Sequence, residues 1–176
     1  MRTIALLPLL VLVAALSGCA GYQIGPIKPS IMAGVNTIAV PNFKNDTLEP
    51  RVETLLASTV IKQIQQDGTY RVVREKDADA ILECTLDEIQ RRPSRSVKTN
   101  VLLTREYVLT LRVRYRVIRR DTGVVLEQRS VIGTTSFFVS GTDTIAGDIA
   151  QDERQAIPIA AEDMAVRLVS QISEGW

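Results

Sequence analysis

The chain has 176 residues, with 21 basic and 20 acidic side chains and a formal net charge of +1. This length fits one domain of common size, and the near-zero charge argues against bulk binding to nucleic acid or anionic membranes, which needs a basic surface. Histidine is absent, so the commonest general base and metal ligand are missing. Composition therefore argues against an enzyme, and we expect no metal and no other cofactor.

The first residues have the pattern of an export signal. Met1 and Arg2 give a positive start, and residues 4–16 form an unbroken apolar run that is shorter than the about 20 residues a spanning helix needs. Ser17 and Gly18 are small enough for a signal peptidase, and Cys19 follows them with a thiol for diacylglycerol transfer. This order resembles the lipobox of bacterial lipoproteins and predicts lipidation of Cys19. An ordinary signal peptide with a chance cysteine is the alternative.

Lipidation predicts a protein held on a membrane without spanning it. Two or three acyl chains anchor firmly, at about 0.8 kcal/mol per buried methylene. Ala20 stands where an aspartate would retain a lipoprotein on the inner membrane, so by that sorting rule we expect the outer membrane, on its periplasmic side. We predict a signal peptide over residues 1–18, a lipidated tether over 19–35 and one domain over 36–176. Once Cys19 carries lipid, Cys84 has no disulfide partner.

The domain begins with a predicted strand and helix. Residues 37–40 are β-prone and closed by Pro41, so the strand ends there or lies at a sheet edge. Residues 45–47 offer helix-capping side chains, and Pro50 suits a first helical turn. A stripe at spacings of three and four then predicts a helix to Gln66, with Gly68 as its stop: Val52, Leu55, Leu56, Thr59, Val60 and Ile64.

Alternating residues predict the strands that follow. Residues 70–73 suit a short strand, and residues 80–86 alternate with Cys84 on the apolar face, where a buried, inert thiol is expected. A long loop is predicted over residues 90–104. Residues 106–119 alternate apolar side chains with arginines, which predicts a long strand. The turn at 121–123 predicts a hairpin, so residues 124–132 are expected to form the partner strand, which continues toward residues 136–139. Phe137 and Phe138 are expected in the core more than against lipid.

The last helix is predicted over residues 151–172, with Pro158 starting or kinking it. Two amphipathic helices bury their stripes most economically on one face of a sheet. We therefore predict an α+β fold: a mainly antiparallel or mixed four-stranded sheet with two amphipathic helices packed on one face. The other sheet face would meet water or a partner. Nothing in the sequence assigns a role to Trp176.

Carboxylates and arginines are the remaining candidates for a site. Glu162 and Asp163 are adjacent on a helix, so their side chains diverge and are expected to be solvated. Glu83 and Asp87 can face Arg112 or Arg114 as ordinary cross-strand pairs. The alternative is an exposed basic sheet that meets phosphates or a protein wall.

The predicted loop carries a cluster of basic residues with no acidic residue among them: Arg91, Arg92, Arg95 and Lys98. The planar fork of arginine suits phosphate and carboxylate. This cluster is either a phosphate-binding loop or merely a soluble one.

Several segments together resemble the LptE family, the lipopolysaccharide-assembly lipoproteins of the outer membrane. Residues 19–23 are close to the family's cysteine-glycine-tyrosine opening. Residues 38–45 and 47–50 look like its first strand and helix entry, residues 77–82 like its next strand start, and Glu106-Tyr107 like the strand after the basic loop. Their order behind a lipobox carries the resemblance.

The resemblance implies a function that is not enzymatic. LptE lipoproteins pair with the β-barrel LptD, plug its lumen, assist its assembly and help lipopolysaccharide reach the outer leaflet. It also implies lipopolysaccharide contact through Arg91, Arg92, Arg95 and Lys98, with Lys98 nearest the expected place. A second basic position expected before the last helix is missing, since residues 141–150 contain no lysine or arginine.

Residues 38–43 and 45–47 also resemble small lipoproteins of another class, which regulate peptidoglycan synthases or form secretion rings. A ring former should self-associate, whereas a barrel plug should be monomeric when free.

Overall fold

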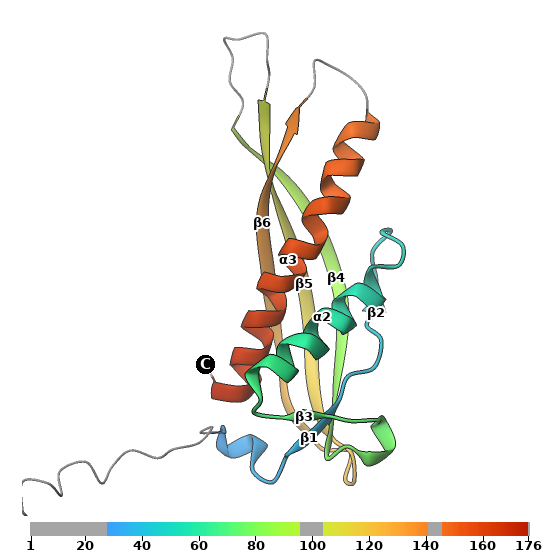
Figure 1. Ribbon diagram of the computed structural model, residues 1–176. Coiled ribbons are helices and arrows are strands. Elements are labelled where there is room, and N and C mark those ends of the chain that lie inside the picture. Colours follow the sequence, from blue (N-terminus) through green and yellow to red (C-terminus); the bar gives the residue numbers. More distant parts are fainter. Residues whose placement is uncertain (1–27, 96–103, 141–145, 176) are drawn as a thin grey trace, which may run out of the picture.

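The computed structural model describes residues 28–95, 104–140 and 146–175. Within these ranges two α-helices lie on the same face of an open, twisted sheet (Figure 1). The sheet has six strands in the order β3-β1-β4-β5-β6, with β2 beside β4. The predicted α+β class is confirmed, and the expected count of four strands is low because two strands, β2 and β3, have only two residues each.

The long strands form an antiparallel half of the sheet and the short ones a parallel half. β4 (Ala80–Arg95), β5 (Thr104–Arg119) and β6 (Val125–Ser140) pair antiparallel over most of their lengths. β1 (Thr37–Ala39) lies between β3 (Arg71–Val72) and β4, parallel to both, and β2 (Lys44–Asn45) is parallel to β4. β1 therefore ends before Pro41, as predicted.

The expected loop over residues 90–104 is mostly strand. β4 continues to Arg95, and Arg91, Arg92 and Pro93 face Leu109, Val108 and Tyr107 of β5. Proline is tolerated in this stretch because a missing N–H harms only a strand with a neighbour on that side, and β2, the last strand on the other side of β4, pairs no further than Leu86. Antiparallel pairing with β5 thus overrides the loop signal of Pro93.

Helix α2 (Val52–Asp67) follows the predicted stripe and ends at Gly68, which has φ 78° and donates its N–H to Ile64. Its N-terminal boundary differs from the prediction, because the residue before it is Arg51 with φ 65° and no side-chain cap. Asn45 instead organises the preceding loop: its side chain accepts the N–H of Thr47 and donates to the carbonyl of Glu49.

Helix α3 (Ala146–Glu174) begins earlier than predicted, so Pro158 lies inside it and does not start it. It packs chiefly on β6 and α2. A Cβ at Gly133 of β6 would overlap the carbonyl oxygen of Ala160 and lie 2.7 Å from the backbone nitrogen of Met164. Glycine is therefore needed at this position for the close approach of helix and strand.

One hydrophobic core fills the space between the helices and the sheet. β5 contributes the alternating side chains expected of it, and both helices contribute one stripe each. Phe137 joins the core and stacks on Tyr107 at a centroid distance of 5.7 Å, whereas Phe138 is 58% exposed. The expectation of a core position thus holds for Phe137 and is wrong for Phe138, because successive strand residues point to opposite faces.

Candidate functional site

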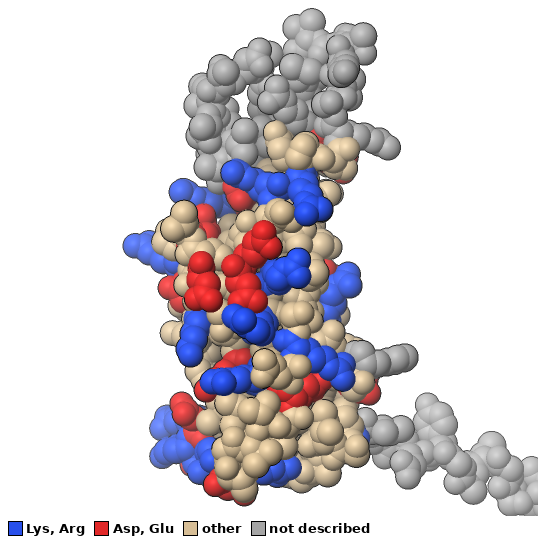
Figure 2. Space-filling model, turned by 180° about the vertical axis from the view of Figure 1, so that it is seen from behind, with Lys and Arg blue, Asp and Glu red and all other residues tan. Residues whose placement is uncertain are grey.

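The open face of the sheet carries a ladder of ion pairs between β4 and β5. Arg116 lies 2.6 Å from Glu83, Arg114 lies 2.7 Å from Asp87, and Arg112 lies 3.6 Å from Glu88. Figure 2 shows blue and red side chains interspersed over this face. Each pair is about half exposed and so contributes at most about 1 kcal/mol to folding. Their combined effect is a hydrated surface on which opposite charges neutralise one another.

The predicted cross-strand pairing of charges is confirmed, with one partner that differs from the prediction. Asp87 pairs with Arg114 as expected, but Glu83 pairs with Arg116. A register shift between Leu86 and Glu88 adds a residue to β4 and brings Glu88 opposite Arg112. The alternation of apolar and polar residues within one strand does not reveal such a bulge.

A shallow hollow of about 340 Å³ lies on the same face. Its rim combines Lys44 and Asn42 with ladder residues Glu83 and Arg116. Polar and charged groups of both signs line it, so it suits hydrated polar side chains of a partner more than an apolar ligand.

Two of the basic residues predicted in one loop, Arg91 and Arg92, do not share a face of the sheet. Arg91 and Arg92 are neighbours in β4, so their side chains point to opposite faces of the sheet. Arg92 faces Val108, on the open side, and is exposed. Arg95 is the last residue of β4, and Lys98 lies outside the described residues.

Arg91 has an acidic partner on the helix side. Its guanidinium lies 2.6 Å from the carboxylate of Glu153 on α3, whose side chain is only 17% exposed. This contact ties the N-terminal part of α3 to β4. A phosphate approaching Arg91 would therefore compete with Glu153, whereas Arg92 has no such competitor among the described residues.

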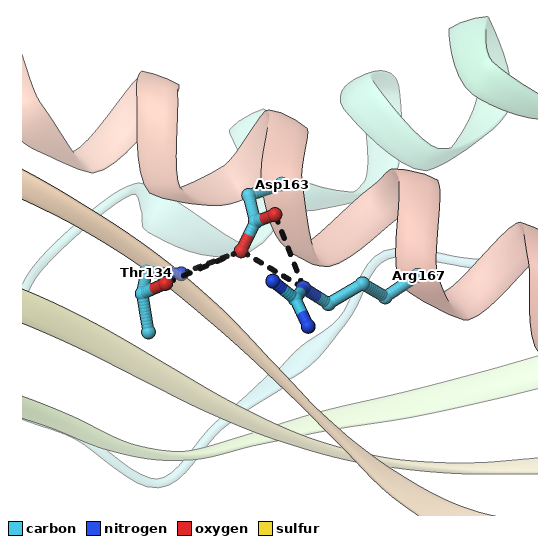
Figure 3. A network of polar contacts seen from close by, with 3 residues as sticks. All are labelled: Thr134, Asp163 and Arg167. Atoms are coloured by element: carbon cyan, nitrogen blue, oxygen red, sulfur yellow. Dashed lines mark hydrogen bonds and ion pairs between the residues drawn. The ribbon is translucent and has the colours of Figure 1, made fainter.

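A second contact ties α3 to the edge of the sheet (Figure 3). The carboxylate of Asp163 accepts the backbone N–H of Thr134 on β6 at 2.9 Å and pairs with Arg167 one turn further along the helix at 3.0 Å. Asp163 thus stays partly solvated, with a side chain that is 32% exposed, while it contacts the strand. The carboxylate reaches the strand because Gly133 lets the helix approach so closely.

Glu127 is the one buried acidic side chain in the described ranges, at 6% exposure. One of its oxygens meets Arg129 at 2.8 Å, and the other has no hydrogen-bond partner there. Desolvation raises the pKa of Glu127, and the nearby Arg129 opposes that shift. Tyr115 lies beside it, and its hydroxyl donates to Gln171 at 2.9 Å.

The remaining predicted site residues lie in the core or outside the described ranges. Cys84 is buried, as expected of an inert thiol, and burial raises its pKa well above the ordinary value. Cys19 and Trp176 lie outside the described residues. In the part of the chain that is described, no cluster of three or more acidic or cysteine side chains could hold a metal ion, and no helix is both long and apolar enough to cross a membrane.

Comparison with solved structures supports the fold. A lipoprotein B from Nitrosomonas europaea is 15% identical, with a TM-score of 0.54, over 88% of this chain and 92% of its own. A minor lipoprotein from Acinetobacter baumannii is 15% identical, with a TM-score of 0.50, over 80% and 92%. A hypothetical protein from Chlamydia trachomatis is 8% identical, with a TM-score of 0.50, over 80% and 99%. At these identities the likeness concerns the fold alone.

Comparison with curated proteins gives no match. The sequence profile of the LptE family, described as lipopolysaccharide-assembly, matches residues 35–172. The match includes the motifs at residues 38–45 and 77–82, both helix stripes and the arginine-rich strand. The chain therefore belongs to the LptE family of lipopolysaccharide-assembly proteins.

Proposed function

We propose that the protein is an outer-membrane lipoprotein, anchored through Cys19, that plugs an LptD-like β-barrel, assists its assembly and helps lipopolysaccharide reach the cell surface. The family match carries the role in lipopolysaccharide assembly. The observation that supports the plug is the ion-pair ladder of the open sheet face. Because the charges of the ladder already neutralise one another, this part of the face can lie against the polar side chains that line a barrel lumen without a need for matching charges there.

The distance between the lipid-anchored N-terminal end and the basic residues of β4 also supports the proposed plug. Lys28, the first described residue, hydrogen-bonds to Val35, and Ala33 accepts a hydrogen bond from Arg119 at the end of β5. The chain from Cys19 to Lys28 spans at most about 30 Å. Arg91 lies eleven residues along β4 from Ala80, which faces Arg119, or about 36 Å at 3.3 Å per residue.

This separation is comparable to the about 30 Å of a bilayer's hydrocarbon core. A plug anchored in the inner leaflet and standing upright in a barrel would thus hold Arg91 and Arg92 near the depth of the opposite headgroups. There their guanidinium groups can meet the phosphates of lipopolysaccharide. We include Arg95 and Lys98 in the same proposed contact.

Affinity purification of the lipidated protein from native outer membranes tests the partnership. We expect one large β-barrel at equal stoichiometry, and a Cys19→Ala variant that no longer sediments with membranes. Recovery of a peptidoglycan synthase, or a stable oligomer of the chain itself, would contradict the plug and favour a regulator or ring former.

A charge-removal experiment tests the lipopolysaccharide contact separately. Replacing Arg91, Arg92, Arg95 and Lys98 with serine should weaken binding to lipopolysaccharide at low salt, where surface charges are least screened. The matched control removes four exposed charges elsewhere: Lys62, Arg71, Arg74 and Lys76. Equal binding by both variants would remove the cluster from the site.

A further inference from the structure

Strand β6 forms a long edge of the sheet. It ends the strand order, and β5 pairs along one side of it over its whole length. The N–H of Thr134 points away from β5, because it donates to Asp163. Alternation in an antiparallel strand sends the peptide groups of Ile132, Ser136 and Phe138 in the same direction. Among the described residues, no acceptor serves the N–H groups of these three.

Helix α3 leaves the upper part of this edge uncovered. Its residue Asp163 contacts Thr134 on β6, but its residue Glu153, nearer the N-terminus, contacts Arg91 on β4. The helix therefore crosses the sheet obliquely, and Figure 1 shows it moving away from β6 above the crossing. The described part of α3 thus covers the β6 edge at Thr134 but not the edge residues that follow Thr134.

The edge also lacks the features that protect edges elsewhere in this sheet. Natural edge strands are usually short, charged or interrupted by proline, because an open edge invites another strand. β3, at the other end of the order, has two residues, and the free side of β4 carries Arg91, Arg92 and Pro93. Residues 130–140 of β6 contain no charged residue and no proline.

We propose that the β6 edge over residues 136–138 is a strand-addition surface, and that its occupant is an unpaired strand of the β-barrel partner before the barrel closes. This inference rests on the proposed function. An extended strand is the occupant that can satisfy a row of outward peptide groups, and a barrel offers free strand edges only until it closes.

The side chains along this edge suit such an occupant. Phe138 is 58% exposed on the open face, and the side chain of Ser136 beside it is uncharged. Barrel strands alternate apolar and polar residues, so Phe138 can pack against an apolar position while no charge is buried. Asp163 marks the lower limit of the surface.

Proline substitution tests the backbone pairing directly. In Ser136→Pro the missing N–H is one that points away from β5, so the β5–β6 ladder is retained while strand addition is blocked. Ser136→Ala keeps the N–H and is the matched control. In co-expression with the LptD-family barrel, we expect Ser136→Pro to recover at least about tenfold less barrel than Ser136→Ala, equivalent to about 1.4 kcal/mol. Equal recovery by the two variants would overturn the inference.

Photo-crosslinking supplies a readout that does not depend on the folding of the proline variant. A benzophenone amino acid at Phe138 should crosslink to the barrel before the barrel closes, whereas the same group at Val166, 49% exposed on α3, should not crosslink at that stage. Equal crosslinking from both positions, or a product of twice the chain's mass from Phe138, would overturn the proposal. A wild-type chain that recovers no barrel would overturn the proposed function as well, whereas recovery with no preference for Phe138 would overturn the edge alone.

Discussion

The close approach of α3 to β6 at Gly133 predicts a large effect of one methyl group. In Gly133→Ala the new Cβ would overlap the carbonyl oxygen of Ala160 and lie 2.5 Å from Cβ and 2.7 Å from the backbone nitrogen of Met164. Two of these three neighbours are backbone atoms, so rotamer changes cannot relieve the overlap and the helix must shift. Overpacking of this kind costs about 1–3 kcal/mol. A shift of the helix would also weaken the hydrogen bond of Thr134 to Asp163, worth about 1.5–3 kcal/mol as a charged one.

The cost is partly offset, because alanine loses about 0.5–1 kcal/mol less backbone entropy than glycine on folding. We therefore expect a net loss of about 3 kcal/mol, or a fall in Tm of about 6–12 °C for a domain of this size. Denaturant unfolding of a Cys19→Ser form measures the loss, with an unchanged m-value as the sign that the unfolded state is unaffected.

Gly68→Ala is the matched control. Gly68 has φ 78° and no atom within 4 Å of an added Cβ, so it carries only the left-handed backbone cost of about 1–2 kcal/mol. A Gly133→Ala loss no larger than the Gly68→Ala loss would refute the close contact between helix and strand, and with it the reason that Asp163 reaches the edge.

Three further predictions concern titratable groups. Asp79 accepts two backbone N–H groups at the start of β1, which lower its pKa. Asp79→Asn should therefore cost about 1–3 kcal/mol above the unfolded pKa, and the difference from wild type should vanish as the pH falls through the folded pKa; a pH-independent difference would contradict this. The raised pKa of Glu127 means that its contribution to stability is lost as the pH rises through the folded pKa. Glu127→Gln should then gain stability relative to wild type over that rise, as followed by thermal melts from about pH 4 to about pH 8. In a Cys19→Ser form, the thiol of Cys84 should react with a thiol reagent only on unfolding, since it is 4% exposed; labelling of the native protein at the rate of a free thiol would show that the core opens.

The local sequence pattern was sufficient to predict those helices and strands whose buried residues recur at a regular spacing. The stripe of α2, the stop at Gly68, the alternation of β5 and the buried position of Cys84 all follow from spacings of three, four or two residues. These residues face one side of an element whatever it packs against, so their placement needs no tertiary information. The family resemblance likewise rested on ordered motifs within one chain.

The interaction surfaces were decided by contacts between segments distant in sequence. Pairing with β5 drew residues 90–95 into a strand, which sent Arg91 and Arg92 to opposite faces instead of one basic loop. The bulge after Leu86 brought Glu88 opposite Arg112, and the crossing of α3 at Gly133 placed Asp163 at the edge of β6. The sequence determined which side chains are charged and which face of each element is apolar. Register, strand length and helix crossing decided which of those charges meet, because these depend on packing over the whole sheet and no single segment encodes them.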